Sequence, residues 1–288
     1  MPGTETLLSS TLLVVVLGLL ASVGWGVGDF GGGLMSRRAP VLGVLFTSQL
    51  ASLTVAIPLL LATHEAPMRP EDYVLSGVAG ALGACGLALL YRGLSVGRMT
   101  VVMPVAAILT AVLPVGFGFV TQGIPSPLAI AGIVAAAAGV VLVSFSPAPD
   151  DGRPSGLWYG IVTGLLFGLF PIVMNGISDD VLVRPVVAVR VASIVTVGTL
   201  LLARRQPWRV PRSMWPAMLA IGLSDMLATA AYLGALDVGP LAIAAILTSL
   251  SNVVTVILAA IVLRERVTLA HAAGIVIAGL AVVLIAAS

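Results

Sequence analysis

Long apolar runs separated by short polar joints fill the chain almost from end to end. A helix that crosses a bilayer needs about 20 mainly apolar residues. The runs are continuous and do not alternate with polar residues, so they predict helices and not barrel strands. Ten spans are expected, over residues 8–34, 41–62, 73–95, 99–121, 126–146, 156–177, 183–203, 214–236, 240–263 and 268–287. This pattern predicts an all-α integral membrane protein.

The chain also repeats itself, without gaps, at a spacing of 142 residues. This spacing relates Gly18 to Gly160, Gly26 to Gly168, Gly80 to Gly222, Leu94 to Leu236, Gly97 to Gly239 and Gly132 to Gly274. We therefore predict a first five-span repeat in residues 1–146, a loop in 147–155 and a second five-span repeat in 156–288. Because five is an odd number, the second copy enters the membrane from the opposite side. The predicted fold is ten transmembrane helices in two inverted repeats.

The distribution of charge predicts an orientation. Charged residues make up 9% of the chain, against about 25% in a soluble domain. All basic residues are arginines; 11 fall in the joints after spans 1, 3, 5, 7 and 9, whereas the other joints hold only Arg69 and Arg184. The positive-inside rule predicts that the arginine-rich side is cytoplasmic and that both termini are not. We expect a multi-pass protein of a bacterial cytoplasmic membrane.

Composition gives no support for an enzyme or for a cofactor. A net charge of +2 provides no reason to invoke nucleic acid. One cysteine and two histidines cannot build a metal cluster or a credible catalytic triad. The Gly-x-Ser-x-Gly pattern at residues 93–97 ends a span, whereas that motif needs a strand–turn–helix context. A chain without lysine also has no phosphate-binding loop of the Gly-Lys-Ser/Thr type, which excludes ATP-driven transport within it.

Three charged residues fall inside predicted spans, where a charge is costly and marks a functional site by default. They are Asp29 in span 1, Arg190 in span 7 and Asp225 in span 8. One hypothesis is that Arg190 binds a solute carboxylate bidentately, while Asp225 or Asp29 binds an amine or a coupling proton. The alternative for Asp225 and Arg190 is a structural ion pair that lets both charges stay buried. The alternative for Asp29 is a position close enough to the membrane interface for the carboxylate to be merely solvated.

Polar and aromatic residues within the spans supply further candidates. Trp25, Tyr91 and Tyr232 either line a cavity or pack against neighbours, and the polar residues Gln49 and Asn252 either contact solute or bond a neighbouring helix. Prolines remove backbone hydrogen bonds inside helices and can kink a gate or expose carbonyls; the candidates are Pro104, Pro114 and Pro171.

Several short motifs resemble the drug/metabolite transporter superfamily of the EamA type. They are Trp25-Gly26, Tyr91-Arg92-Gly93-Leu94 running to Gly97, Tyr232-Leu233-Gly234-Ala235-Leu236 running to Gly239, Arg264-Glu265-Arg266 and Gly274. The resemblance covers the whole chain. It implies a carrier of small solutes, often an exporter of amino acids or other metabolites, that works by alternating access.

The repeat alone also favours a carrier, because duplicated membrane proteins of this size are most often carriers. We therefore predict a secondary-active transporter, an exporter of small polar metabolites such as amino acids, with its site near the midplane between the repeats. Its partners would be a small solute and the bilayer, with protons as the candidate coupling ion, and a monomer would suffice. One alternative is a multidrug exporter of lipophilic cations, which an unpaired Arg190 would disfavour and a neutralised Arg190 would favour. Another is a non-transporting protein such as a scramblase or an assembly partner.

Overall fold

The protein is a bundle of apolar helices. The computed structural model describes residues 4–96, 99–144, 155–178, 181–264 and 268–288. Gly97, Glu265 and most of the predicted inter-repeat loop therefore lie outside the described residues. The helices are α1 (Thr4–Ser36), α2 (Val41–Thr63), α3 (Pro70–Val96), α4 (Met99–Gln122), α5 (Pro127–Ser144), α6 (Leu157–Met174), α7 (Val183–Arg204), α8 (Trp215–Val238), α9 (Leu241–Ser249), α10 (Ser251–Val262) and α11 (Leu269–Ala286), with a short 3₁₀ turn at Arg212–Met214.

The prediction of ten membrane-spanning helices is confirmed. Ten helical stretches in the described residues are long and apolar enough to cross a bilayer, and the protein is a multi-pass integral membrane protein. Most helix ends lie within about three residues of the predicted ones, and α1 and α3 begin a few residues earlier. The spans could be predicted from continuous apolar runs because apolar residues must cover the full thickness of the hydrocarbon core.

The ninth span differs from its prediction as one continuous helix. It is divided into α9 and α10 at Leu250, which is neither proline nor glycine. Before the break, the hydroxyls of Thr248 and Ser249 donate to the carbonyls three residues back, at 2.9 and 2.7 Å. Such local bonds compete with the helical backbone pattern. The break places a group of polar side chains in the middle of an apolar span.

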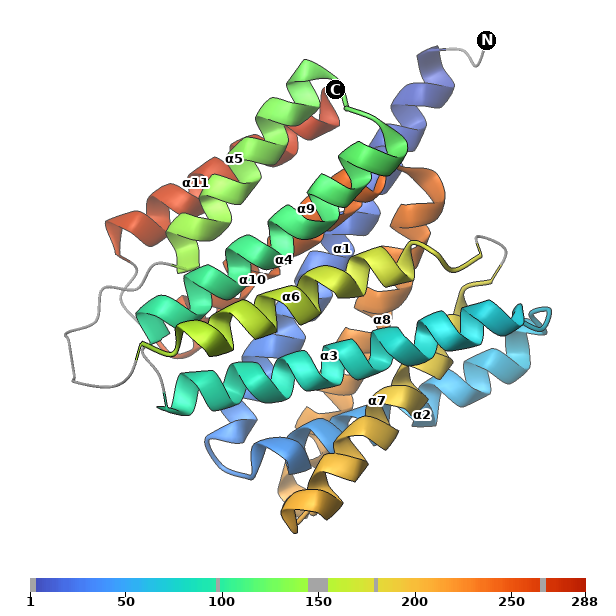
Figure 1. The fold of residues 1–288 in the computed structure, drawn as a ribbon, viewed down its shortest axis with the longest axis vertical. Coiled ribbons are helices and arrows are strands. Elements are labelled where there is room, and N and C mark those ends of the chain that lie inside the picture. The colour runs from blue at the N-terminus through green and yellow to red at the C-terminus, as the bar shows by residue number, and fades with distance from the viewer. Residues whose placement is uncertain (1–3, 97–98, 145–154, 179–180, 265–267) are drawn as a thin grey trace.

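The two halves of the chain interlock rather than standing side by side. At the 142-residue spacing α1 corresponds to α6, α2 to α7, α3 to α8, α4 to α9 with α10, and α5 to α11. Helix α1 packs on α8 and α3 packs on α6, while α4 packs on α6 and α1 packs on α9 and α10. Each contact thus recurs with the two halves exchanged, as a two-fold relationship requires. In Figure 1, α3 and α6 cross the centre of the bundle beside α1 and α8.

Two equivalent glycines allow the closest of these approaches. A Cβ at Gly80 in α3 would collide with the Val189 carbonyl of α7, and a Cβ at Gly222 in α8 would collide with the Ser48 carbonyl of α2. Small residues let membrane helices approach to backbone contact. A glycine at the same position of each half therefore allows the close α3–α7 contact and the close α2–α8 contact.

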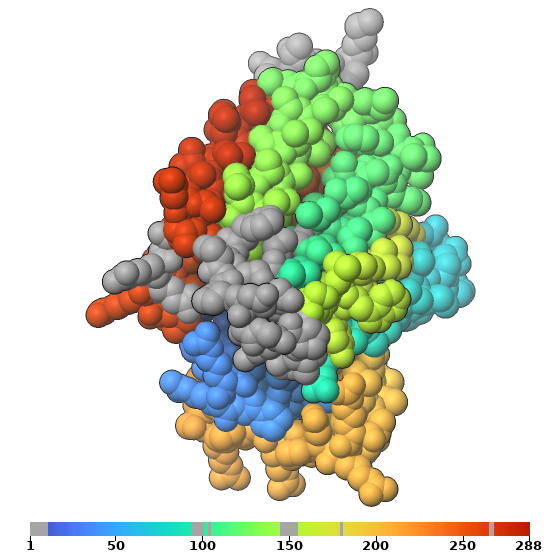
Figure 2. Space-filling model, turned by 60° about the vertical axis from the view of Figure 1, so that its left-hand side comes forward, coloured from blue at the N-terminus to red at the C-terminus, as the bar shows by residue number. Residues whose placement is uncertain are grey.

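Helices α5 and α11 form a pair at one edge of the bundle. They pack on each other, with Gly139 against Gly274 and Gly132 against Ile285. Figure 1 shows this pair at the upper left, away from α2, α3 and α7, and Figure 2 shows it as one continuous green and red surface. The pair contributes no residue to the central cavity described next.

Candidate functional site

A cavity of about 210 Å³ lies between the two halves of the chain. Its walls come from α1, α2, α3 and α4 of the first half and from α6, α7, α8, α9 and α10 of the second. A drug-sized ligand pocket usually has about 300–1,000 Å³. This cavity is therefore the size of a small metabolite, and it lies where an interface between repeats is expected to hold a transported solute.

Equivalent positions of the two repeats face one another across the cavity. Seven pairs of lining residues are related by the 142-residue spacing: Trp25 and Phe167, Asp29 and Pro171, Gly83 and Asp225, Leu87 and Thr229, Ala106 and Thr248, Ala107 and Ser249, and Thr110 and Asn252. Both halves of the chain therefore contribute equivalent positions to the same cavity.

Chemically, the two walls are unlike. The α3–α4 wall offers mainly Gly83, Leu87, Ala106 and Ala107, whereas the equivalent α8–α9 wall offers a carboxylate and three hydroxyls. A solute in this cavity would meet an apolar surface on one side and hydrogen-bonding groups on the other. The symmetric frame thus holds an asymmetric site.

Both terminal guanidinium nitrogens of Arg190, in α7, have hydrogen-bond partners on neighbouring helices. Its side chain is 4% exposed and forms an ion pair with Asp225 of α8, whose side chain is 26% exposed. The same guanidinium nitrogen donates to Gln49 Oε1 at 3.0 Å, and the other terminal nitrogen donates to the Thr229 hydroxyl and, at 3.1 Å, to the Asp225 carbonyl. Arg190 Nε is buried and has no partner in the described part of the chain. No guanidinium donor is left open to the cavity.

Gln49 closes this network from α2. Its Nε2 donates to Asp225 Oδ2 at 3.1 Å while its Oε1 accepts from Arg190. A buried charge that keeps both its counter-ion and its hydrogen bonds is held in place, because losing either partner exposes a large desolvation cost. The alternative reading of Asp225 and Arg190 as an ion pair is what the structure contains.

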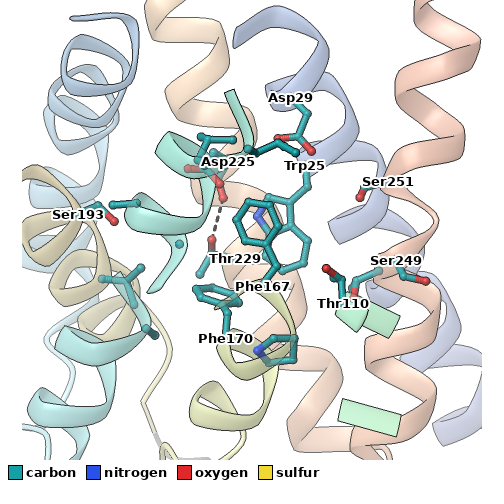
Figure 3. Close-up of a pocket in the computed structure, with 18 of the residues that line it drawn as sticks. Trp25, Asp29, Thr110, Phe167, Phe170, Ser193, Asp225, Thr229, Ser249 and Ser251 are labelled. Atoms are coloured by element: carbon teal, nitrogen blue, oxygen red, sulfur yellow. Dashed lines mark hydrogen bonds between the residues drawn. The ribbon is translucent and has the colours of Figure 1, made fainter. Parts of the chain in front are cut away.

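Asp29 differs from Asp225, because its carboxylate has no ion-pair or hydrogen-bond partner among the described residues. It lies one turn beyond Trp25 on α1, and both line the cavity. Figure 3 shows the Asp29 carboxylate above the Trp25 ring, with Asp225 and Thr229 on one side and Thr110, Ser249 and Ser251 on the other. The lining residues hold one arginine and two aspartates, so Asp29 is the lining carboxylate that the arginine does not neutralise.

Two aromatic side chains pack against the ring of Trp25. Its ring meets Phe170 edge-on at 5.9 Å and Tyr232 at 5.5 Å between ring centroids. Tyr232 is fully buried, does not line the cavity, and donates its hydroxyl to the Pro171 carbonyl at 3.4 Å. Tyr232 therefore positions Trp25 and lies too deep to touch a solute in this conformation.

The remaining sequence candidates fall into three groups. Asn252 lines the cavity beside the helix break, and its Nδ2 donates to the Ser249 carbonyl at 3.5 Å. Pro171 lines the cavity near the end of α6, while α4 runs unbroken through Pro104 and Pro114. The side chains of Tyr91 and Pro104 lie outside the described residues. The gating role of the three prolines stays a prediction.

Several lining residues escaped sequence reasoning. Thr229, Phe167, Phe170 and Ser249 belong to the site, but nothing separates them individually from ordinary span residues. The repeat contained a usable signal, since Phe167 is the equivalent of Trp25 and Thr229 lies one turn from Asp225. A candidate in one repeat points to its equivalent in the other whenever the site lies on the two-fold axis.

Residues 154–287 match the EamA-like transporter family. The match covers the second repeat, a little under half of the chain, and makes the chain similar to EamA-type transporters. A solved crystal structure has the same fold, with a TM-score of 0.71 and 18% sequence identity over 96% of this chain and 97% of the other. No curated protein sequence matches the chain.

The similarity to EamA-like transporters directs attention to the cavity. Members of this family are membrane transporters and not enzymes, so a cavity between repeats with a buried ion pair and a free carboxylate is the place to look for its solute. The family match also favours transport over the scramblase and assembly-partner alternatives.

Proposed function

We propose that this protein is an EamA-type transporter that carries small solutes with a protonated amine through the central cavity by alternating access. The observation that supports this proposal is the unpaired carboxylate of Asp29 beside Trp25, in a cavity whose single arginine is already neutralised. Asp29 is an exposed residue that lines the cavity. Within a membrane span, a carboxylate without a counter-ion is costly unless a cation accompanies it. An amine of the solute, or a proton, supplies that charge.

The indole of Trp25 adds to the same preference. A cation within about 6 Å of a tryptophan ring centroid gains roughly 0.5–2 kcal/mol from the ring quadrupole. Asp29 and Trp25 are four residues apart on one helix and therefore lie on one face. An ammonium group placed between them would contact both the carboxylate and the ring.

The rest of the solute would be small and two-sided. An apolar portion fits the α3 wall at Gly83 and Leu87, and hydroxyl or carbonyl groups fit the α9–α10 break at Ser249 and Asn252. The ion pair of Arg190 with Asp225 meets the condition under which a lipophilic-cation exporter is favoured. The volume of about 210 Å³ nevertheless favours a small metabolite over a bulky multidrug substrate. Amino acids remain within this class, with the amine at Asp29 and the carboxylate near the break.

Binding of a solute carboxylate by Arg190 is the second candidate arrangement. It requires Arg190 to release Asp225, Gln49 or Thr229, because all of its accessible donors are occupied. An incoming carboxylate could replace that of Asp225 if Asp225 took up a proton at the same time. This exchange would couple transport to protons through Asp225, as Asp29 would couple it if amine and proton compete there.

We further propose export as the direction, a monomer as the working unit and the bacterial cytoplasmic membrane as the location. The arginine distribution supports termini on the non-cytoplasmic side, since positively charged joints stay in the cytoplasm. A reporter fused at Ser288 that is active only in the cytoplasm would overturn this orientation.

The solute proposal is tested by ligand-induced thermal stabilisation of the purified protein. The panel contains primary amines, amino acids, organic acids, sugars, nucleosides and lipophilic cations, each at two pH values. A ligand that binds only the folded protein stabilises it by RT ln(1 + [L]/Kd), which is about 2.7 kcal/mol at 100 times Kd. Stabilisation by amines or amino acids but not by organic acids is expected. Stabilisation by organic acids alone would move the solute to Arg190.

A further inference from the structure

One face of the molecule is tied across the two repeats by charged and polar side chains. The ties join the connection between α2 and α3, in the first repeat, to the connection between α6 and α7, in the second. Figure 1 shows these two connections together at the right-hand edge. We call the carboxylates of Glu65 and Asp72, with their partners Arg69, Ser178, Leu182, Val183 and Arg184, the polar latch.

Glu65 caps a helix of the other repeat. Its carboxylate accepts hydrogen bonds from the backbone N–H groups of Leu182, Val183 and Arg184 at 2.8–3.1 Å. These are N–H groups at the start of α7, which have no partner within the helix. Arg184 returns the contact by donating its guanidinium to the Glu65 carbonyl at 2.7 and 3.1 Å. The helix that carries Arg190 thus begins on a carboxylate from the opposite repeat.

Asp72 forms the second half of the polar latch. Its side chain is fully buried at the start of α3 and pairs with the Arg69 guanidinium at 3.0 Å. It also accepts from the backbone N–H of Ser178 at 3.2 Å and from the Ser178 hydroxyl at 2.5 Å. Both arginines that the sequence places on this side of the membrane, Arg69 and Arg184, belong to the polar latch.

A third tie lies on the same face. Gln122, at the end of α4, accepts from the backbone N–H of Leu241 at 2.8 Å and donates to Asn175 Oδ1 at 3.4 Å. Leu241 begins α9 and Asn175 follows α6, so this amide also bridges the repeats. Three separate side chains of the first repeat therefore hold the second repeat at one end of the bundle.

On the opposite, arginine-rich face, the positions equivalent to the two carboxylates are not acidic. The equivalents of Glu65 and Asp72 are Pro207 and Met214, and the equivalent of Ser178 is Ser36. The Ser36 hydroxyl is buried without a hydrogen-bond partner among the described residues. There the α1–α2 turn meets the α7–α8 connection through apolar packing of Met214 and Val210 with Met35 and Ala39. Figure 2 shows this end of the bundle, where gold α7–α8 residues project beside blue α1–α2 residues.

We infer that the polar latch is the gate that keeps the cavity closed on its own face and sets the resting state of the transporter. Alternating access requires the two repeats to separate at one end and then at the other, around a fixed site. Separation at this end breaks charged hydrogen bonds. Among the described residues, separation at the equivalent positions of the other end parts apolar packing and one neutral hydrogen bond, from the Thr47 hydroxyl to the Trp208 carbonyl at 3.4 Å. The resting protein therefore opens its cavity towards the arginine-rich face. This inference rests on transport by alternating access, as proposed above.

The test is cysteine accessibility of the cavity. In a chain with Cys85→Ser, a thiol is introduced in the cavity wall by Thr110→Cys and labelled with a membrane-impermeant maleimide added from one side or the other. His64→Cys and Arg205→Cys, both exposed and on opposite faces, report which face the reagent reaches. The labelling is measured without solute, so its outcome does not depend on which solute is carried.

The double variant Glu65→Gln with Asp72→Asn is compared with Glu71→Gln. Glu71 is 62% exposed and contacts only Arg69 of its own repeat among the described residues, so it is the matched control. We expect labelling from the latch face to rise about tenfold or more in the double variant, since loss of a charged hydrogen bond shifts a two-state equilibrium by at least that factor. Glu71→Gln should behave like the parent.

Ser178→Ala keeps the inference testable if the double variant does not fold. It removes one hydroxyl from Asp72 and should raise labelling from the latch face by a smaller, measurable factor. Unchanged labelling from the latch face in folded variants would overturn the gate and leave the polar latch as a purely structural contact. Shifted labelling with no amine binding would retain the gate and reject the proposed solute.

Discussion

Arg190 and Asp225 form an ion pair in the cavity wall, although the equivalent positions of the other repeat hold Ser48 and Gly83. The fold duplicates the frame of the site but not its charge. Because the arginine is neutralised within the protein, the proposed function assigns the charge preference of the cavity to Asp29. Asp225 neutralises Arg190, whereas Asp29 is the carboxylate proposed to bind the solute.

The ion pair predicts a non-additive effect on stability. Removing one partner of a buried pair leaves an uncompensated charge and costs about 3–5 kcal/mol. Arg190→Ala and Asp225→Ala should therefore each lower the melting temperature of the purified protein strongly. The double variant should melt above the Arg190→Ala single variant, because it buries no lone charge. Additive losses in this double-mutant cycle would show that the pair is not coupled.

The polar latch predicts opposite outcomes at two equivalent serines. Ser178→Ala removes a hydrogen bond to the Asp72 carboxylate, and a bond to a charged group contributes about 1.5–3 kcal/mol. Ser36→Ala removes a buried hydroxyl without a partner in the described chain, so it should be neutral or stabilising. Thermal unfolding of the two variants under identical conditions measures the contrast. Equal destabilisation by both would contradict the assigned asymmetry.

Helix approach at the equivalent glycines gives a packing prediction. A Cβ at Gly80 or Gly222 would collide with a carbonyl of the neighbouring helix, so Gly80→Ala and Gly222→Ala should each cost about 1–3 kcal/mol by overpacking. Gly77 is the matched control, since a Cβ there has no heavy atom within 4 Å. Gly77→Ala should leave stability unchanged or improve it by up to about 1 kcal/mol, because alanine favours the helix. Chemical denaturation resolves these differences.

The sequence predicted the number and order of the membrane spans better than the side-chain contacts between them. Ten spans follow from uninterrupted apolar runs, and five spans per repeat follow from the 142-residue spacing. Interruption of the ninth span at Leu250 could not be foreseen, because no proline or glycine stands at the break. For Asp225 and Arg190, the sequence allowed two hypotheses, solute binding and an ion pair. The ion pair could be seen only once the structure placed α7 against α8.

The polar latch was missed for a different reason. Glu65 and Asp72 stand in or near a polar joint, where acidic residues are ordinary, and their partners lie more than 100 residues away. A comparison of equivalent joints held the signal, since Pro207 and Met214 replace the two acids in the other copy. Tyr232 shows the converse, because a motif residue in a span proved to support Trp25 from behind and not to line the cavity.

Trp25 gives a prediction about the solute amine. Trp25→Leu should weaken binding of a primary amine by roughly 0.5–2 kcal/mol through loss of the cation–π contact. Phe167→Leu changes the equivalent position of the other repeat, which has Pro171 in place of a carboxylate, and should weaken it less. Calorimetric titration of both variants with the same amine compares them. A larger loss in Phe167→Leu would place the amine on the other side of the cavity.

The central claim is that the Asp29 carboxylate binds the positive charge of the solute. The most direct measurement is the affinity of one stabilising amine for the parent protein, for Asp29→Asn and for Asp29→Glu. Loss of one charged contact contributes about 1.5–3 kcal/mol, so Asp29→Asn should bind at least about tenfold more weakly, while Asp29→Glu keeps the charge and retains most of the affinity. Equal affinities for the parent and Asp29→Asn, with both proteins folded, would contradict the claim.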